Sequence, residues 1–105
     1  MTSNKFTGVL GELIERAERG GAEDVDHLMS HLNTGSTLAM TRFIDYALSR
    51  VTSEQGIRRL EHYLFKGTRM QRNYSSLFFN RRYDYDLVKR AYEEGRIDGV
   101  QAFAR

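Results

Sequence analysis

The apolar residues of this chain recur with the period of an α-helix. Between residues 6 and 17 they stand three and four positions apart, and the same spacing returns in each later segment. No stretch long enough for a β-strand alternates apolar and polar residues, as a half-buried strand would. We therefore predict an all-α protein. The predicted core residues are Phe6, Val9, Leu10, Leu13, Ile14, Ala17, Val25, Leu28, Met29, Leu32, Met40, Phe43, Ile44, Ala47, Leu48, Val51, Ile57, Leu60, Leu64, Phe65, Met70, Tyr74, Leu77, Phe78, Leu87, Val88, Ala91 and Tyr92.

The ends of these segments are marked without proline, which the chain lacks. Glycine accepts the left-handed backbone that closes a helix, and hydroxyl or carboxylate side chains bind the free amides at a helix start. Thr52, Thr68 and Asp98 are each followed three positions later by glutamine, the spacing of a capping box. The signals predict about six helices and a short terminal turn that carries Val100 and Phe103. The predicted stops include Gly20, Gly35, Gly67 and Gly95, and the starts Ser36 or Thr37, Thr52, Thr68 and Asp84.

The chain has 105 residues, enough to form one hydrophobic core but too few for two independent ones. We therefore predict a single helical domain over residues 1–105. Because there is no cysteine, disulfides, thiolate zinc sites and cysteine nucleophiles are excluded. The polar start, residues 1–5, is followed by no apolar leader segment, so the expected location is the cytoplasm, without a membrane span.

The predicted helix starts are evenly spaced. Ser36, Thr52, Thr68 and Asp84 follow one another at intervals of sixteen residues. The apolar positions of residues 25–32 also return thirty-two residues later. A helix-hairpin repeat of this length is typical of an α-solenoid, in which each helix pair buries its apolar face against its neighbours. The alternative is a helical bundle of equally long helices, so we predict antiparallel helix hairpins in one of these two arrangements.

One hairpin of the chain resembles a known repeat. Its first helix has Met70, Arg72, Tyr74, Leu77 and Phe78; the turn has Arg81, Arg82 and Asp84; and the second helix has Leu87, Val88 and Ala91. This order of apolar residue, arginine and leucine, then aspartate at a turn, then a valine and alanine stripe, resembles a short HEAT-type repeat. The resemblance covers residues 70–92. It implies a scaffold or binding surface and brings no catalytic residues with it.

The charges divide unevenly along the chain. Residues 1–52 hold five basic and seven acidic residues, whereas residues 53–105 hold eleven basic and seven acidic. Between residues 58 and 82 seven basic side chains accompany one acid and alternate with aromatic residues. Arginine and aromatic side chains together contact single-stranded nucleic acid, through phosphates and stacked bases, but they also form ion pairs with acidic protein surfaces.

Consecutive aromatic residues indicate a contact surface. Phe78 and Phe79 point about 100° apart on a helix, so one narrow core stripe cannot bury both. We predict that Phe79 meets a partner, and that Tyr83 and Tyr85 add aromatic contact surface of the kind enriched at interfaces. A homodimer would bury such residues. The predicted binding residues are Arg58, Arg69, Arg72, Phe79, Arg81, Arg82 and Tyr83.

No catalytic residue set stands out in the sequence, and we predict neither an enzyme nor a cofactor. The one candidate for a metal site consists of Asp24, His27 and His31, at positions i, i+3 and i+7 of a helix. No small-molecule substrate is indicated. We expect an interaction module that binds a protein partner or associates with itself. Single-stranded RNA or DNA binding by the surface of residues 58–83 is the first alternative, and an enzyme without a recognisable motif is the second.

Overall fold

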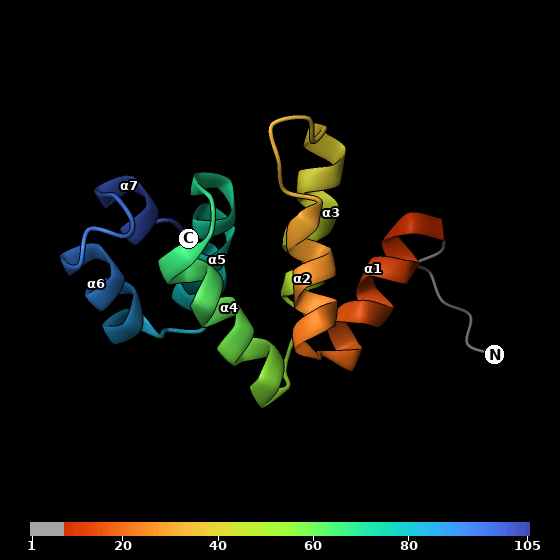
Figure 1. Cartoon of the computed structure of the whole chain (residues 1–105), viewed down its shortest axis with the longest axis horizontal. Helices are drawn as coiled ribbons and strands as arrows, with labels where there is room; N and C mark the ends of the chain where they lie inside the picture. Colours follow the sequence, from red (N-terminus) through yellow and green to blue (C-terminus); the bar gives the residue numbers. More distant parts are fainter. Residues whose placement is uncertain (1–7) are drawn as a thin grey trace. The chain divides into compact units, whose positions relative to one another are not determined.

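The structure is a computed structural model that describes residues 8–105, and this part of the chain contains helices and no strand, as predicted (Figure 1). It has seven helices instead of about six, because the terminal turn forms a helix of its own. The chain divides into two compact units, Met1–Ile57 and Arg58–Arg105. The helices are α1 (Gly8–Arg19), α2 (Ala22–Ser30), α3 (Leu38–Leu48), α4 (Glu54–Lys66), α5 (Arg69–Arg81), α6 (Tyr85–Glu93) and α7 (Gly99–Ala102).

In the first unit α1, α2 and α3 contact one another pairwise. The apolar stripes predicted for α2 and α3 are largely buried, whereas α1 buries only its second half. Val9 is 53% exposed, so its prediction as a core residue is wrong; it lies in the first turn, beyond the buried stripe. Phe6 lies outside the described residues. The buried apolar residues of these helices are Leu13, Ile14, Ala17, Val25, Leu28, Met29, Ile44, Ala47 and Leu48.

Small residues allow the turn after α1 to approach the start of α4. The hydroxyl of Ser53 donates to the carbonyl oxygen of Gly20 at 2.7 Å and accepts the N–H of Gly56 at 3.1 Å. Ser53 is therefore the residue that caps α4. The prediction that Thr52 caps it is wrong by one position, because the neighbouring hydroxyl reaches both backbone groups.

The second unit is held together around α5, which contacts both α6 and α7, and α6 also contacts α7. Two polar side chains attach the end of the chain to α5. Asn80 donates from Nδ2 to the carbonyl oxygens of Ala102 and Ala104, at 3.0 and 2.7 Å, and Gln101 donates from Nε2 to that of Arg69 at 3.1 Å. The buried apolar residues are Leu60, Leu64, Phe78, Phe79, Val88, Ala91 and Ile97.

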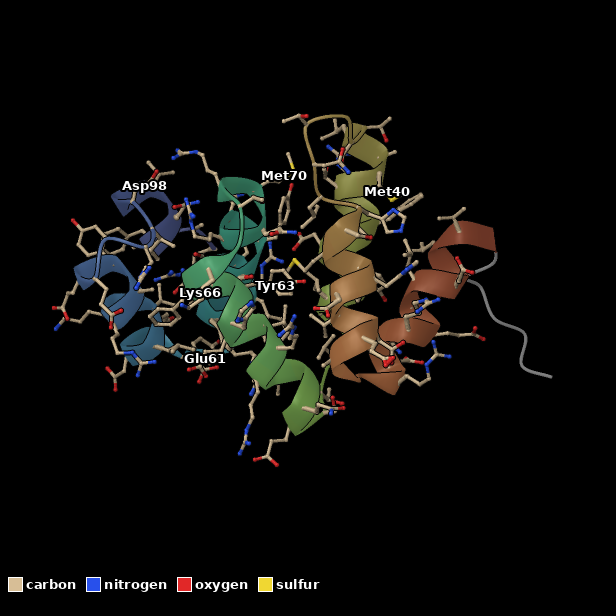
Figure 2. The ribbon with its side chains drawn as sticks, viewed as in Figure 1. Met40, Glu61, Tyr63, Lys66, Met70 and Asp98 are labelled. Carbon is tan, nitrogen blue, oxygen red and sulfur yellow. The ribbon has the colours of Figure 1, made fainter. Side chains whose placement is uncertain are left out.

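Two of the predicted capping boxes are confirmed. Thr68 and Gln71 exchange hydrogen bonds at the start of α5, and Asp98, labelled in Figure 2, does so with Gln101 at the start of α7. Asp84 precedes α6 as predicted, but its carboxylate makes no cap hydrogen bond and instead accepts from Nε of Arg82 at 3.1 Å.

The even spacing of helix starts persists in the structure with a shift. The residues that precede α2, α3 and α4 are Gly21, Thr37 and Ser53, sixteen residues apart. Thr68 then follows at fifteen and Asp84 at sixteen residues. Thr37 and Ser53 thus fall one position later than Ser36 and Thr52 of the predicted series, and Thr37 is the alternative start predicted for its helix.

We expect Gly56→Ala to lower the free energy of unfolding by about 1–2 kcal/mol, because overpacking outweighs the gain in helix propensity. A Cβ atom at Gly56 would lie 2.6 Å from Cγ1 of Val51 and 2.9 Å from the carbonyl oxygen of Gly20. Gly99→Ala is the matched control, since it also lies in the first turn of a helix but meets nothing within 4 Å. Urea unfolding monitored by circular dichroism measures both variants. Equal or greater stability of Gly56→Ala than of the unchanged chain would contradict the close approach.

Candidate functional site

Tyr83 adopts a backbone conformation that side chains disfavour. It follows α5 with a φ of +67°. Its N–H donates to the carbonyl oxygen of Asn80 at 3.0 Å, and that of Asp84 donates to Phe79 at 2.9 Å. These two bonds form the Schellman motif, whose left-handed residue is usually glycine. A residue with a Cβ atom costs about 1–2 kcal/mol in this conformation.

The end of α6 shows the same motif with the usual residue. Gly95 has a φ of +75°, its N–H donates to the carbonyl oxygen of Tyr92, and the N–H of Arg96 donates to that of Ala91. Gly95 and Tyr83 therefore occupy equivalent positions. Burial does not compensate for the strained backbone of Tyr83, because this residue is 78% exposed.

Other aromatic and apolar side chains of the second unit are also exposed. The ring of Tyr85 lies edge-on to that of Tyr83, with 6.0 Å between ring centroids. Tyr92 is about half exposed, so its prediction as a core residue is wrong; it lies beside the buried stripe of α6. Among the residues that the structure describes, five of the eight large exposed hydrophobic residues fall between positions 83 and 103: Tyr83, Tyr85, Tyr92, Val100 and Phe103.

A groove of about 370 Å³ lies among several of these side chains. Its walls come from α6 and from the end of the chain, and its lining is mostly apolar. The groove is not among the features predicted from the sequence. The pattern that could have indicated it is the spacing of Tyr85, Val88 and Tyr92 at i, i+3 and i+7, which places them along one side of α6. The groove residues are Asn80, Tyr85, Val88, Lys89, Tyr92, Glu93, Ala102, Phe103 and Arg105.

The predicted binding residues all belong to the second unit, but they do not form one cluster. Arg81, Arg82 and Tyr83 are exposed together at the end of α5. Arg69 lies at the opposite end of this helix, about 18 Å away at 1.5 Å per residue, and pairs with Asp98 at 2.8 Å.

Two other predicted binding residues are part of the fold. Arg72 is half-buried and donates from Nη1 to the carbonyl oxygen of Gly67 at 2.8 Å, which closes the end of α4. Phe79 is 2% exposed, so the prediction that it meets a partner is wrong. Because α5 contacts both α6 and α7, more than one of its sides can be buried, and Phe78 and Phe79 are both buried.

Arg58 borders an open, charged hollow of the second unit, of about 610 Å³. Arg90 of α6 donates to Glu61, labelled in Figure 2, at 3.3 Å and lies 5.0 Å above the ring of Phe65. Glu94 pairs with Arg90 and Arg96 at 3.9 and 3.7 Å. The acids thus balance part of the positive charge in this hollow. Its lining residues are Arg58, Glu61, His62, Phe65, Lys66, Arg90, Glu94 and Arg96.

The candidate metal ligands of the first unit do not form a metal site. Within residues 8–105 no group of three His, Cys, Asp or Glu side chains could hold a metal ion. The carboxylate of Asp24 instead accepts from Arg19 at 2.9 Å and from the N–H of Gly21 at 3.1 Å, and these bonds lower its pKa. The rings of His27 and His31 stack edge to face, with 5.1 Å between centroids.

No family model, no curated protein and no solved structure matches the chain. The HEAT resemblance of residues 70–92 therefore gains no support from them. A membrane-spanning helix would need to be longer and more apolar than any helix that residues 8–105 form.

We expect the stability of the first unit to fall as the pH drops below about 6.5, because folding lowers the pKa of His27. Burial and the positive charges of Arg16 and His31 lower its pKa from the ordinary value of 6.5, while Glu12 and Asp24 oppose this shift more weakly. The unfolded chain therefore takes up a proton on this side chain at a higher pH than the folded chain does.

This loss of stability is measured as the change in the urea concentration at the unfolding midpoint between pH 7.5 and pH 5. The variant His27→Gln removes the titrating group and should flatten the profile in this range. An unchanged slope in His27→Gln would contradict the assignment. Asp24 does not interfere, because its pKa is lowered from 3.8 and its contribution is lost only at more acidic pH.

Proposed function

We propose that the chain is a non-enzymatic helical interaction module that binds a protein partner, or a second copy of itself, through its basic and aromatic second unit. The finer architecture belongs to the same proposal. Evenly spaced helix starts support a repeat in which hairpins stack as in HEAT proteins, and a closed bundle is the alternative.

Tyr83 is the observation that carries this proposal. Glycine at this position would relieve the strain, as Gly95 does in the equivalent motif after α6. The tyrosine is strained and exposed, and its contact with Tyr85 is itself at the surface. Strained residues cluster at functional sites, and tyrosine is enriched among residues that dominate interfaces. We infer that Tyr83 serves binding and not folding.

The excess of basic residues in the second unit supports an acidic partner. The second unit holds eleven basic and six acidic residues, and Arg81 and Arg82 directly precede Tyr83. Rim charges of this kind accelerate and orient association. The same combination of exposed tyrosine and arginine also suits single-stranded nucleic acid, which is the second candidate.

Tyr83→Gly separates binding from folding. We expect this variant to gain about 1 kcal/mol in the free energy of unfolding and to lose association. Self-association is measured by gel filtration with light scattering, and partner binding by affinity capture from native extract with quantitative mass spectrometry. The control Tyr46→Ala removes an exposed tyrosine of α3 in the first unit, and it should leave self-association and partner binding unchanged.

The proposal would be refuted if neither the capture of a partner nor self-association depended on Tyr83. A titration with fluorescent single-stranded RNA at two salt concentrations tests the second candidate. Binding that weakens with salt and is lost in Tyr83→Gly would favour nucleic acid over protein.

A further inference from the structure

The groove of the second unit exposes aromatic rings around a concave apolar surface. Tyr85 and Tyr92 of α6 and Phe103 after α7 line it, and Phe103 is 75% exposed. Its volume, about 370 Å³, lies at the lower end of the range of small-ligand sites, so a single large side chain would occupy much of it. An apolar surface of this kind gains free energy when a ligand removes it from water.

The lining of the groove also includes a buried amide. Asn80 of α5 is 1% exposed, and its two bonds to the carbonyl oxygens of Ala102 and Ala104 identify Nδ2 as the donor. Its Oδ1 atom is therefore an acceptor, and it has no hydrogen-bond partner in the structure of residues 8–105. A buried acceptor without a partner is unfavourable, so a ligand that brings a donor gains an additional hydrogen bond there.

The charges at the groove favour an acidic ligand. Lys89 and Arg105 both line it, against the single acid Glu93. Lys89 lies 4.0 Å from Glu93, and the guanidinium of Arg105 lies 5.0 Å above the ring of Tyr85. The whole unit carries the same excess of basic residues, so like-charge repulsion disfavours a basic ligand.

We propose that this groove binds a tryptophan side chain within an acidic segment of the protein partner. The indole is a large aromatic ring whose N–H donates a hydrogen bond, and it has no acceptor atom. Phenylalanine or leucine would leave Oδ1 of Asn80 unpaired, and a tyrosine hydroxyl would bring an acceptor of its own into the apolar site. This inference rests on the proposed function, and it names the chemistry that the partner presents.

Binding requires a small rearrangement in the chain. Oδ1 of Asn80 has almost no exposed area, so the indole reaches it only after neighbouring groups of the groove move. The side chain of Phe103 is mostly in water, so little packing opposes its movement, whereas the two bonds from Asn80 hold the backbone of Ala102 and Ala104. The amides of residues 102–104 are therefore the reporters of binding.

The test is a titration of the ¹⁵N-labelled full chain with synthetic peptides, followed by NMR. The probe is a ten-residue peptide of glutamate, aspartate, serine and glycine with one central tryptophan. Its matched variants carry 3-benzothienylalanine, an isostere without the N–H, or alanine in place of tryptophan, or lysine in place of the acids. We expect shifts at residues 102–104 and at the side-chain amide of Asn80, and affinity about tenfold lower for the benzothienyl peptide, which corresponds to one hydrogen bond.

Two variants of the chain locate the site. Phe103→Asp should weaken binding of the tryptophan peptide at least tenfold. Val100→Asp adds the same charge to an exposed apolar position of α7 outside the groove, and should change affinity less than threefold. Equal losses in both variants would overturn the groove as the site.

The outcomes separate this inference from the proposed function. Equal affinities of the tryptophan and benzothienyl peptides, or tighter binding of the lysine peptide, would overturn the inference even where Tyr83→Gly still loses its partner. Shifts of the same amides by a ten-nucleotide single-stranded RNA, without shifts by the tryptophan peptide, would also overturn it. Association that is independent of Tyr83 would instead overturn the proposed function.

Discussion

Short helices are at best marginally stable alone in water, and this constraint shapes the whole chain. The six longer helices have nine to thirteen residues, at or below the length at which an isolated helix becomes marginal. Each therefore depends on a closed end and on one buried stripe. In the first unit, Ser53 binds the backbone of two segments through one hydroxyl, and in the second, Asn80 fastens the end of the chain to α5.

Much of this architecture could be predicted from the sequence because it depends on local patterns. Apolar spacing identified most buried residues, and Thr68 and Asp98 cap their helices as their spacing indicates. Predictions failed where tertiary packing decides. Phe79 is buried because α5 has neighbours on more than one side, and no pattern in a single helix reveals a second neighbour.

The candidate site was only partly visible in the sequence for a related reason. Tyr83 was predicted from its residue type and its neighbours, but the feature that distinguishes it is a backbone angle. A tyrosine after a helix does not by itself indicate a left-handed conformation; the two hydrogen bonds around Asn80 and Phe79 do. Likewise, the groove needs the end of the chain folded onto α5, a contact that long-range hydrogen bonds establish.

Site-specific photo-crosslinking at position 83 measures whether Tyr83 faces a partner. A benzophenone amino acid is placed at Tyr83 in one sample and, as a control, at Tyr46, the exposed tyrosine of α3. After irradiation in native extract, we expect a discrete adduct, to a partner or to a second copy, from position 83 and none from position 46. Adducts from position 46 alone, or equal adducts from both, would contradict this expectation.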